Sequence, residues 1–138
     1  MLDDLGVASA LQWFCRDFAE TYPKLALAVE VSVHDDDVPE RLATVVYRSA
    51  QELLNNVAKH ANARNVVVRL RIDEQVLTLQ VRDNGVGVEG ASVESRRHGS
   101  GLRNLRERAQ MTGGEFSVTK APGRGTLAQL SWRLVDAD

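Results

Sequence analysis

Asp83-Asn84-Gly85-Val86-Gly87 is the stretch that decides the fold expected for this chain. Before it, apolar and polar residues alternate over 66–72 and 77–81, with a turn at Asp73-Glu74-Gln75 between them, which predicts a β-hairpin. From Asp83 onward, residues 83–101 form a long glycine-rich stretch with few apolar anchors. Loops of this length inside compact domains are usually functional or mobile. The pentapeptide therefore indicates the point where a buried strand ends and a functional loop begins.

Helix and strand patterns precede this hairpin. Helical spacing of apolar residues over 7–22 predicts a helix that Pro23 ends, and alternation over 25–33 predicts a half-buried strand. Asp37 and Glu40 are spaced as in a capping box and predict the start of a long helix, whose apolar stripe runs over 42–60.

A last helix and a second hairpin follow the glycine-rich stretch. Apolar spacing over 102–112 predicts the helix, which Gly113-Gly114 closes. Alternation over 116–134, with a turn at 121–125, predicts the hairpin. The fold class expected is α+β, a two-layer α/β sandwich with helices on one face of a mixed, mostly antiparallel sheet.

Size and composition favour one ordinary globular domain over residues 1–138. The net charge of -2 and the absence of a lysine-arginine run argue against nucleic-acid binding. Cys15, the single cysteine, lies in an apolar stripe and is expected in the core of a protein from a reducing compartment. No apolar run reaches the ~20 residues of a membrane span, so direct membrane contact by this domain is not expected. The domain is expected to be cytoplasmic, although its parent protein could be anchored to a membrane.

The predicted long helix carries polar groups on one face. Asn56 follows Glu52 by four residues, and Lys59 and His60 come one turn later. A solvated helix face would explain a bare Glu-x-x-x-Asn pattern. Mg²⁺, however, prefers oxygen ligands and needs only one or two protein groups beside phosphates, so Asn56 is a candidate metal ligand. Glu52 could orient or deprotonate a ligand water, and Lys59 could meet a phosphate as a point charge.

Asp83 is the candidate for recognising a base. A plain turn would account for Asp-Asn-Gly alone, but a buried carboxylate would accept a hydrogen bond from the amino group of adenine and would repel the oxygen of guanine. Gly85 and Gly87 would let the backbone approach the flat base. Thr126, after the Gly123-Arg124-Gly125 turn, matters only if its hydroxyl reaches the same base.

Gly99-Ser100-Gly101 precedes the last helix and offers backbone amides at a helix N-terminus, where phosphates bind readily. A lone Gly-x-Gly is weak evidence, because glycines often simply precede helices. The preceding Arg96-Arg97-His98 is expected to be a solvated charge cluster.

The four segments together resemble the GHKL superfamily of ATP-binding proteins. Residues 51–61, QELLNNVAKHA, resemble the N box of sensor histidine kinases whose partners are LuxR-type response regulators. Residues 83–87 resemble the first glycine box of this subfamily, and Gly99-Ser100-Gly101-Leu102 with the helix after it resembles the second. Residues 123–126 resemble the last box, and 2–11 are similar to the segment that leaves the dimerisation helices.

This resemblance implies a Bergerat-type ATP-binding fold and a role for each box. Asn56 would hold Mg²⁺, Asp83 and Thr126 would recognise the adenine of ATP, and Lys59 and His60 would lie near phosphates. Residues 88–101 would form the ATP lid. The domain would donate the γ-phosphate to a histidine on a separate, upstream dimerisation domain that is absent here, and a response regulator would act downstream.

Other classes remain open. An anti-sigma-factor-type serine kinase shares the nucleotide boxes and a similar size, and a stand-alone GHKL ATPase would hydrolyse ATP by itself. A non-enzymatic nucleotide-dependent module is a further alternative. The helix after Gly101 and the opening segment favour the histidine kinase.

Overall fold

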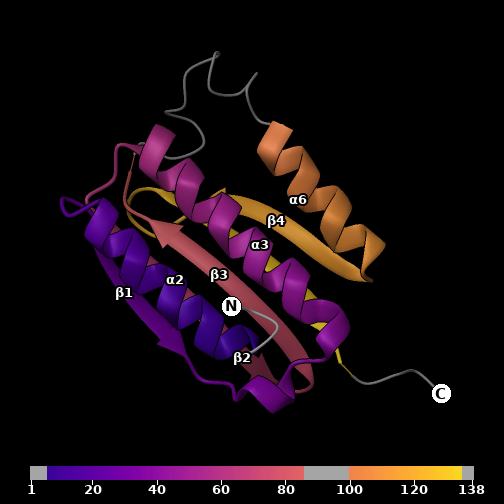
Figure 1. Ribbon diagram of the computed structural model, residues 1–138. Coiled ribbons are helices and arrows are strands. Elements are labelled where there is room, and N and C mark those ends of the chain that lie inside the picture. Colours follow the sequence, from indigo (N-terminus) through magenta and orange to yellow (C-terminus); the bar gives the residue numbers. More distant parts are fainter. Residues whose placement is uncertain (1–5, 86–99, 135–138) are drawn as a thin grey trace.

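The computed structural model describes residues 6–85 and 100–134, which form three α-helices and five strands (Figure 1). Their order along the chain is α2 (Val7–Thr21), β1 (Ala26–Val31), α3 (Glu40–Asn56), β2 (Asn65–Asp73), β3 (Val76–Asp83), α6 (Ser100–Met111), β4 (Gly114–Lys120) and β5 (Thr126–Arg133). Two short turns supplement them, a 3₁₀ turn at Asp35–Asp37 and a π-helical turn at Val57–Ala61 that continues α3.

The five strands form one mixed sheet in the order β1-β2-β3-β5-β4. The edge strand β1 runs parallel to β2, and every other neighbouring pair is antiparallel. Both expected hairpins are present, β2–β3 and β4–β5. The first turns through Glu74 and Gln75, which both have positive φ, although neither is glycine. The fold class predicted from the sequence is confirmed.

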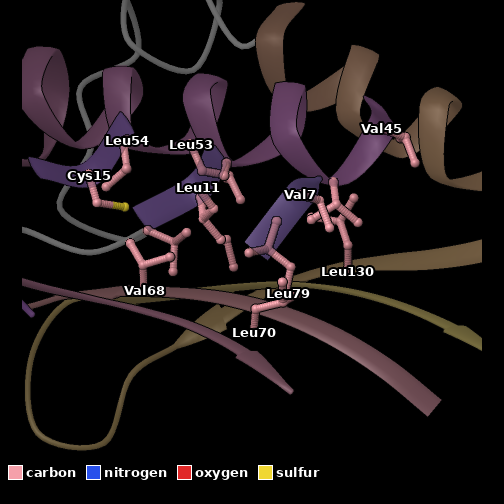
Figure 2. Close-up of a cluster of buried hydrophobic side chains, with 14 of the residues drawn as sticks. Val7, Leu11, Cys15, Val45, Leu53, Leu54, Val68, Leu70, Leu79 and Leu130 are labelled. Atoms are coloured by element: carbon pink, nitrogen blue, oxygen red, sulfur yellow. The ribbon is translucent and has the colours of Figure 1, made fainter. Parts of the chain in front are cut away.

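The helices cover one face of this sheet (Figure 1). Every second residue of the central strands faces them, and Leu70, Leu79 and Leu130 pair across three strands with no exposed surface. Figure 2 shows these leucines beneath side chains from α2 and α3. Full burial of one such leucine is worth roughly 2 kcal/mol, so this layer holds the sandwich together. Cys15 lies in this core, as expected, and burial raises the pKa of its thiol to about 12.

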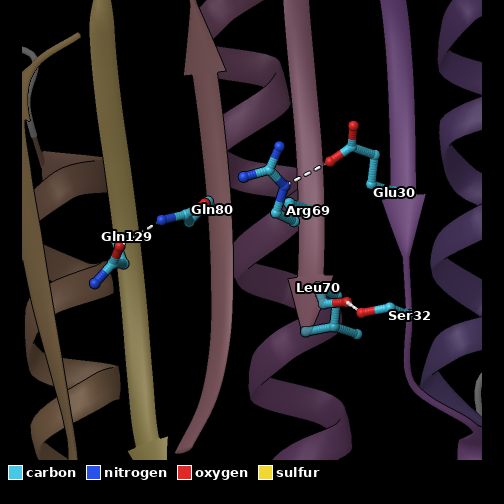
Figure 3. Close-up of polar contacts among 6 residues, drawn as sticks. All are labelled: Glu30, Ser32, Arg69, Leu70, Gln80 and Gln129. Atoms are coloured by element: carbon cyan, nitrogen blue, oxygen red, sulfur yellow. Dashed lines mark hydrogen bonds and ion pairs between the residues drawn. The ribbon is translucent and has the colours of Figure 1, made fainter. Parts of the chain in front are cut away.

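The opposite face of the sheet is polar. Arg69 forms an exposed ion pair with Glu30, and the side-chain amide of Gln80 donates to Gln129 at 2.7 Å (Figure 3). None of the helices in the described part of the chain combines the length and the apolar character that a membrane span requires.

The capping box predicted for α3 is wrong. Pro39 occupies the N-cap position and makes no side-chain cap. The Asp37 carboxylate instead accepts a hydrogen bond from the backbone N–H of His34 at 2.9 Å, which stabilises the preceding 3₁₀ turn. The spacing of the sequence could not show which backbone N–H the Asp37 carboxylate would bind, because Asp37 lies next to both the 3₁₀ turn and the first turn of α3.

A distant carboxylate caps α2. The N-cap residue Gly6 has no side chain, and Asp35 accepts hydrogen bonds from the Ser9 backbone N–H at 3.1 Å and the Ser9 hydroxyl at 2.7 Å. Burial alone would raise the pKa of Asp35. The hydrogen bonds from Ser9 and Ala8, together with nearby His34, outweigh that effect and hold the pKa below its ordinary value.

Asp35→Ala is expected to lower the free energy of unfolding by about 1 kcal/mol at pH 7, as for other lost helix caps. Because the pKa of Asp35 is depressed in the folded chain, its contribution is present above the unfolded value, near pH ~4, and is lost as pH falls through the lower folded value. Urea unfolding across pH 3–7 should therefore show the two proteins converging only in acid. Asp36→Ala is the control, because Asp36 is exposed, and an equal loss in both variants would contradict the capping role.

Candidate functional site

Three elements end on one side of the molecule. The C-terminal end of α3, the C-terminal end of β3 and the turn between β4 and β5 all lie toward the upper left of Figure 1. Strand β5 starts there, in register with the end of β3, so Thr126 pairs with Asp83. The segments singled out in the sequence at 52–56, 83–85 and 123–126 therefore belong to one end of the sandwich.

Asp83 is the buried carboxylate of this site. Leu77, Leu79 and Val81 face the helices, and the alternation of β3 puts Asp83 next in that inward row, with only 6% of its surface exposed. Its Oδ1 accepts a hydrogen bond from the Gly85 backbone N–H at 2.8 Å. Burial raises the pKa of Asp83, and the backbone N–H groups of Gly85 and Thr126 offset part of that rise. Such a carboxylate is held in a fixed orientation as a hydrogen-bond acceptor.

Asn84 has a role that the sequence did not reveal. Its side-chain oxygen accepts hydrogen bonds from the backbone N–H groups of Arg64 and Asn65, both at 2.9 Å, and its own N–H donates to the Asn65 carbonyl. The Asn84 side chain therefore joins the end of β3 to the start of β2. Asparagine is common in turns for local reasons, so the sequence did not predict this long-range contact.

Gly125 brings the β4–β5 turn against the same residues. Its φ is +106°, and a Cβ placed on it would lie 1.9 Å from the Asp83 carbonyl oxygen. Beside it, Arg124 Nε donates to the Gly85 carbonyl at 3.0 Å. The turn was expected to be an ordinary hairpin turn. It is a hairpin turn, as expected, and it also packs against the backbone from the Asp83 carbonyl to Gly85.

Asn56, the candidate metal ligand, is the last residue of α3 and is partly exposed. Lys59 follows in the π-helical turn with an exposed side chain, and Asn62, at φ +51°, ends that turn. His60 lies in the same turn, but its side chain is outside the described residues. Glu52, one turn before Asn56, forms an ion pair with Arg108 of α6, a contact that the sequence did not predict.

The second glycine segment is described only from its end. Gly87 and Gly99 lie outside the described residues, as does most of the stretch 88–101 expected to be a lid. Ser100 begins α6, Gly101 follows it, and Leu102 in the first turn is exposed.

Two contacts fix the rest of α6 against the fold. Leu105 and Ala109 are fully buried, and the Thr112 hydroxyl just beyond the helix accepts a hydrogen bond from Trp132 Nε1 at 2.9 Å. The start of α6 is therefore positioned by a firmly packed helix body.

The donor groups are compatible with magnesium and a polyphosphate. Across residues 6–85 and 100–134, no three His, Cys, Asp or Glu side chains gather as a metal site. Mg²⁺ does not require one, because it commonly keeps several waters and takes one or two protein ligands together with substrate phosphates. The side-chain amide oxygen of Asn56 is an oxygen donor of the type that Mg²⁺ accepts.

Comparison with known proteins identifies the family. Residues 41–136 match the family described as histidine kinase-, DNA gyrase B- and HSP90-like ATPase. The chain is 35% identical over 131 residues to the sensor histidine kinase MctS of Rhizobium johnstonii, covering 94% of this chain and 28% of that protein. It is 31% identical over 139 residues to the oxygen sensor histidine kinase NreB of Staphylococcus carnosus, covering 98% of this chain and 38% of that protein. The chain thus spans less than two fifths of either relative.

Solved structures agree on the fold. The histidine kinase domain of the blue-light activated histidine kinase from Erythrobacter litoralis EL346 superimposes with a TM-score of 0.74 at 20% identity, over 96% of this chain and 68% of that one. At that identity the likeness concerns the fold alone. The family match and the relatives together give the classification. The chain belongs to the histidine kinase-, DNA gyrase B- and HSP90-like ATPase family and is an ATPase domain of the histidine kinase type.

Proposed function

We propose that this chain binds Mg-ATP and donates the γ-phosphate to a histidine on the dimerisation domain of its parent kinase. The observation that carries the proposal is the buried Asp83 carboxylate, held by backbone N–H groups at the end of β3. A fixed acceptor at this position suits the amino group of adenine and disfavours guanine. The family match supports ATP as the nucleotide.

The remaining candidate residues have roles that follow from their chemistry. Asn56 would hold Mg²⁺, which neutralises phosphate charge when bound. Lys59 would contact a phosphate, and Thr126 would assist Asp83 at the base. The backbone amides of Ser100 and Gly101, at the start of α6, would face the phosphate tail. His60, Gly87 and Gly99 stay candidates for the same site from the sequence alone.

Phosphoryl transfer needs a nucleophile that this chain is not expected to supply. A ring nitrogen of the acceptor histidine forms a bond to the γ-phosphorus, the bond from that phosphorus to the β,γ-bridging oxygen breaks, and ADP leaves. Such transfer depends mainly on placing the nucleophile in line with the leaving oxygen. The domain would hold ATP in place until the dimerisation domain presents its histidine.

The partners follow from the same proposal. The dimerisation domain passes the phosphate to a response regulator, which we propose is of the LuxR type, in the cytoplasm where ATP is available. Oxygen-sensor kinase NreB, a relative by sequence, supports placement in a two-component pathway.

Asn56→Ala is expected to weaken binding of a Mg-dependent, non-hydrolysable ATP analogue at least about tenfold and to abolish phosphotransfer, because Mg²⁺ would lose its protein ligand. Adenosine binding without metal should survive. The measurements are calorimetric titration and transfer of radiolabel from ATP to a separately supplied dimerisation domain.

Asn55→Ala is the matched control, because it replaces the same type of side chain at the neighbouring, exposed position of α3. Full phosphotransfer by Asn56→Ala would refute the metal assignment. Acid-stable label on a serine of a partner would instead indicate a serine kinase, and rapid ATP hydrolysis by this chain alone would indicate a stand-alone ATPase.

A further inference from the structure

Arg108 and Glu52 connect the two helices that border the site. Arg108 Nη1 lies 3.4 Å from Glu52 Oε2, although the residues are 56 positions apart in the sequence. Only 34% of the Arg108 side chain and 25% of the Glu52 side chain are exposed. We propose that Arg108 is a positioning residue that holds the Glu52 carboxylate away from the phosphates of the bound nucleotide and neutralises its charge. This inference rests on the function proposed above.

The position of Glu52 makes its charge consequential. Residues four apart on a helix lie on one face with their Cβ atoms about 6 Å apart, so Glu52 and Asn56 are neighbours on α3. If Asn56 holds the Mg-triphosphate as proposed, a free carboxylate on the same helix face one turn away would repel the phosphates. Paired with a guanidinium, the same carboxylate carries little net charge toward its surroundings.

The position of Arg108 makes it suitable for this task. It lies on α6 between the buried residues Leu105 and Ala109, so its backbone is fixed by the core. Its carbonyl oxygen also accepts a hydrogen bond from the Thr112 hydroxyl at 2.9 Å, and that hydroxyl is in turn bound by Trp132. The guanidinium is therefore presented to α3 from a rigid part of α6.

Stability alone does not explain this pair. Partly exposed ion pairs of this separation contribute little to folding, so its loss should barely affect thermal unfolding. The chain offers a direct comparison in the Arg69–Glu30 pair on the polar face of the sheet (Figure 3). That pair joins β2 to the edge strand β1, away from the helices, and its side chains are 41% and 54% exposed.

The test is whether a second substitution restores the nucleotide affinity that the first one removes. Arg108→Ala is expected to weaken the Mg-dependent ATP analogue roughly fivefold at low salt, because an uncompensated carboxylate then faces the phosphates. Adenosine affinity should not change. Arg108→Ala combined with Glu52→Gln should restore triphosphate affinity to within about twofold of the parent chain, because the repelling charge is gone.

Two further variants separate positioning from general structure. Arg108→Lys keeps the positive charge and should retain most of the affinity, and Arg69→Ala should leave both ligands unaffected. The deficit of Arg108→Ala should shrink in high salt, since screening weakens repulsion.

Three results would overturn the inference: equal losses for adenosine and the triphosphate, no restoration in the double variant, or no loss in Arg108→Ala while the parent chain binds normally. A parent chain that binds no adenine nucleotide would instead refute the proposed function itself.

Discussion

Asp83→Asn is expected to reduce the affinity for adenine nucleotides by about a hundredfold while leaving the fold intact. The carboxylate offers acceptors both to the Gly85 N–H and to a ligand. An asparagine oxygen can satisfy Gly85, but its NH₂ group then points toward the ligand, where it opposes the amino group of adenine. Loss of a buried hydrogen bond to a charged group costs roughly 1.5–3 kcal/mol, and an opposing donor adds to that cost. Titration with Mg-ADP, the ATP analogue and GTP measures the effect.

Asp73→Asn is the control for this change, because Asp73 is an exposed carboxylate at the far end of the same hairpin. It should bind like the parent chain. If GTP binds the parent chain as tightly as the adenine nucleotides do, Asp83 does not read the base.

The stability of Asp83→Asn should differ from that of most substitutions at buried sites. Burial raises the pKa of Asp83, so the folded chain holds the proton more tightly than the unfolded chain does. The ionised carboxylate therefore costs stability above its ordinary pKa, and the cost grows until the pH passes the raised folded value. Asp83→Asn removes that charge, so the free energy of unfolding at pH 7 should be unchanged or slightly higher. A residue that binds tightly at the expense of stability is typical of a functional site.

The sequence predicted those parts of the fold that depend on periodicity. Alternation identified β2 and β3 because one face of each strand is buried. The structure extends this inward row of β3 to Asp83, where the sequence alone was also compatible with a plain turn. Helical spacing identified α3 and its inward face for the same reason. These signals are strong because burial acts on every second residue of a strand and on every third or fourth residue of a helix.

The sequence could not predict contacts between distant segments. Asp35 caps a helix that begins 28 residues earlier, and Asn84 bonds to the backbone 19 and 20 residues before it. The Glu52–Arg108 pair likewise could not be predicted from the local sequence, because each residue alone fits a solvated helix face. Which partner a polar side chain selects is decided by tertiary packing, after the helices and strands are in place.

Gly125 is the clearest case of a local signal with a hidden tertiary cause. Any glycine in Gly123-Arg124-Gly125 is explained by a hairpin turn, and both glycines do have positive φ, +86° and +106°. Only the structure separates them. A Cβ on Gly123 would meet nothing within 4 Å, whereas at Gly125 the Asp83 carbonyl oxygen and the Asn84 Cα occupy the space that a Cβ would need.

Gly125→Ala is therefore expected to be far more damaging than Gly123→Ala. A left-handed backbone costs an alanine roughly 1 kcal/mol, and this is the whole expected loss at position 123. At position 125 a methyl group 1.9 Å from a backbone oxygen forces β5 away from the end of β3, which should bring the loss to about 3 kcal/mol or more.

The displacement should also disturb nucleotide binding, because Thr126 and the Arg124–Gly85 hydrogen bond lie at the same place. Urea unfolding and titration with Mg-ADP, performed on both alanine variants, measure the two effects. Equal stability of the two variants would mean that the β4–β5 turn can move without cost. Intact nucleotide affinity in a destabilised Gly125→Ala would mean that the close approach of the turn serves folding alone, and that Asp83 needs no support from Gly125 to bind its ligand.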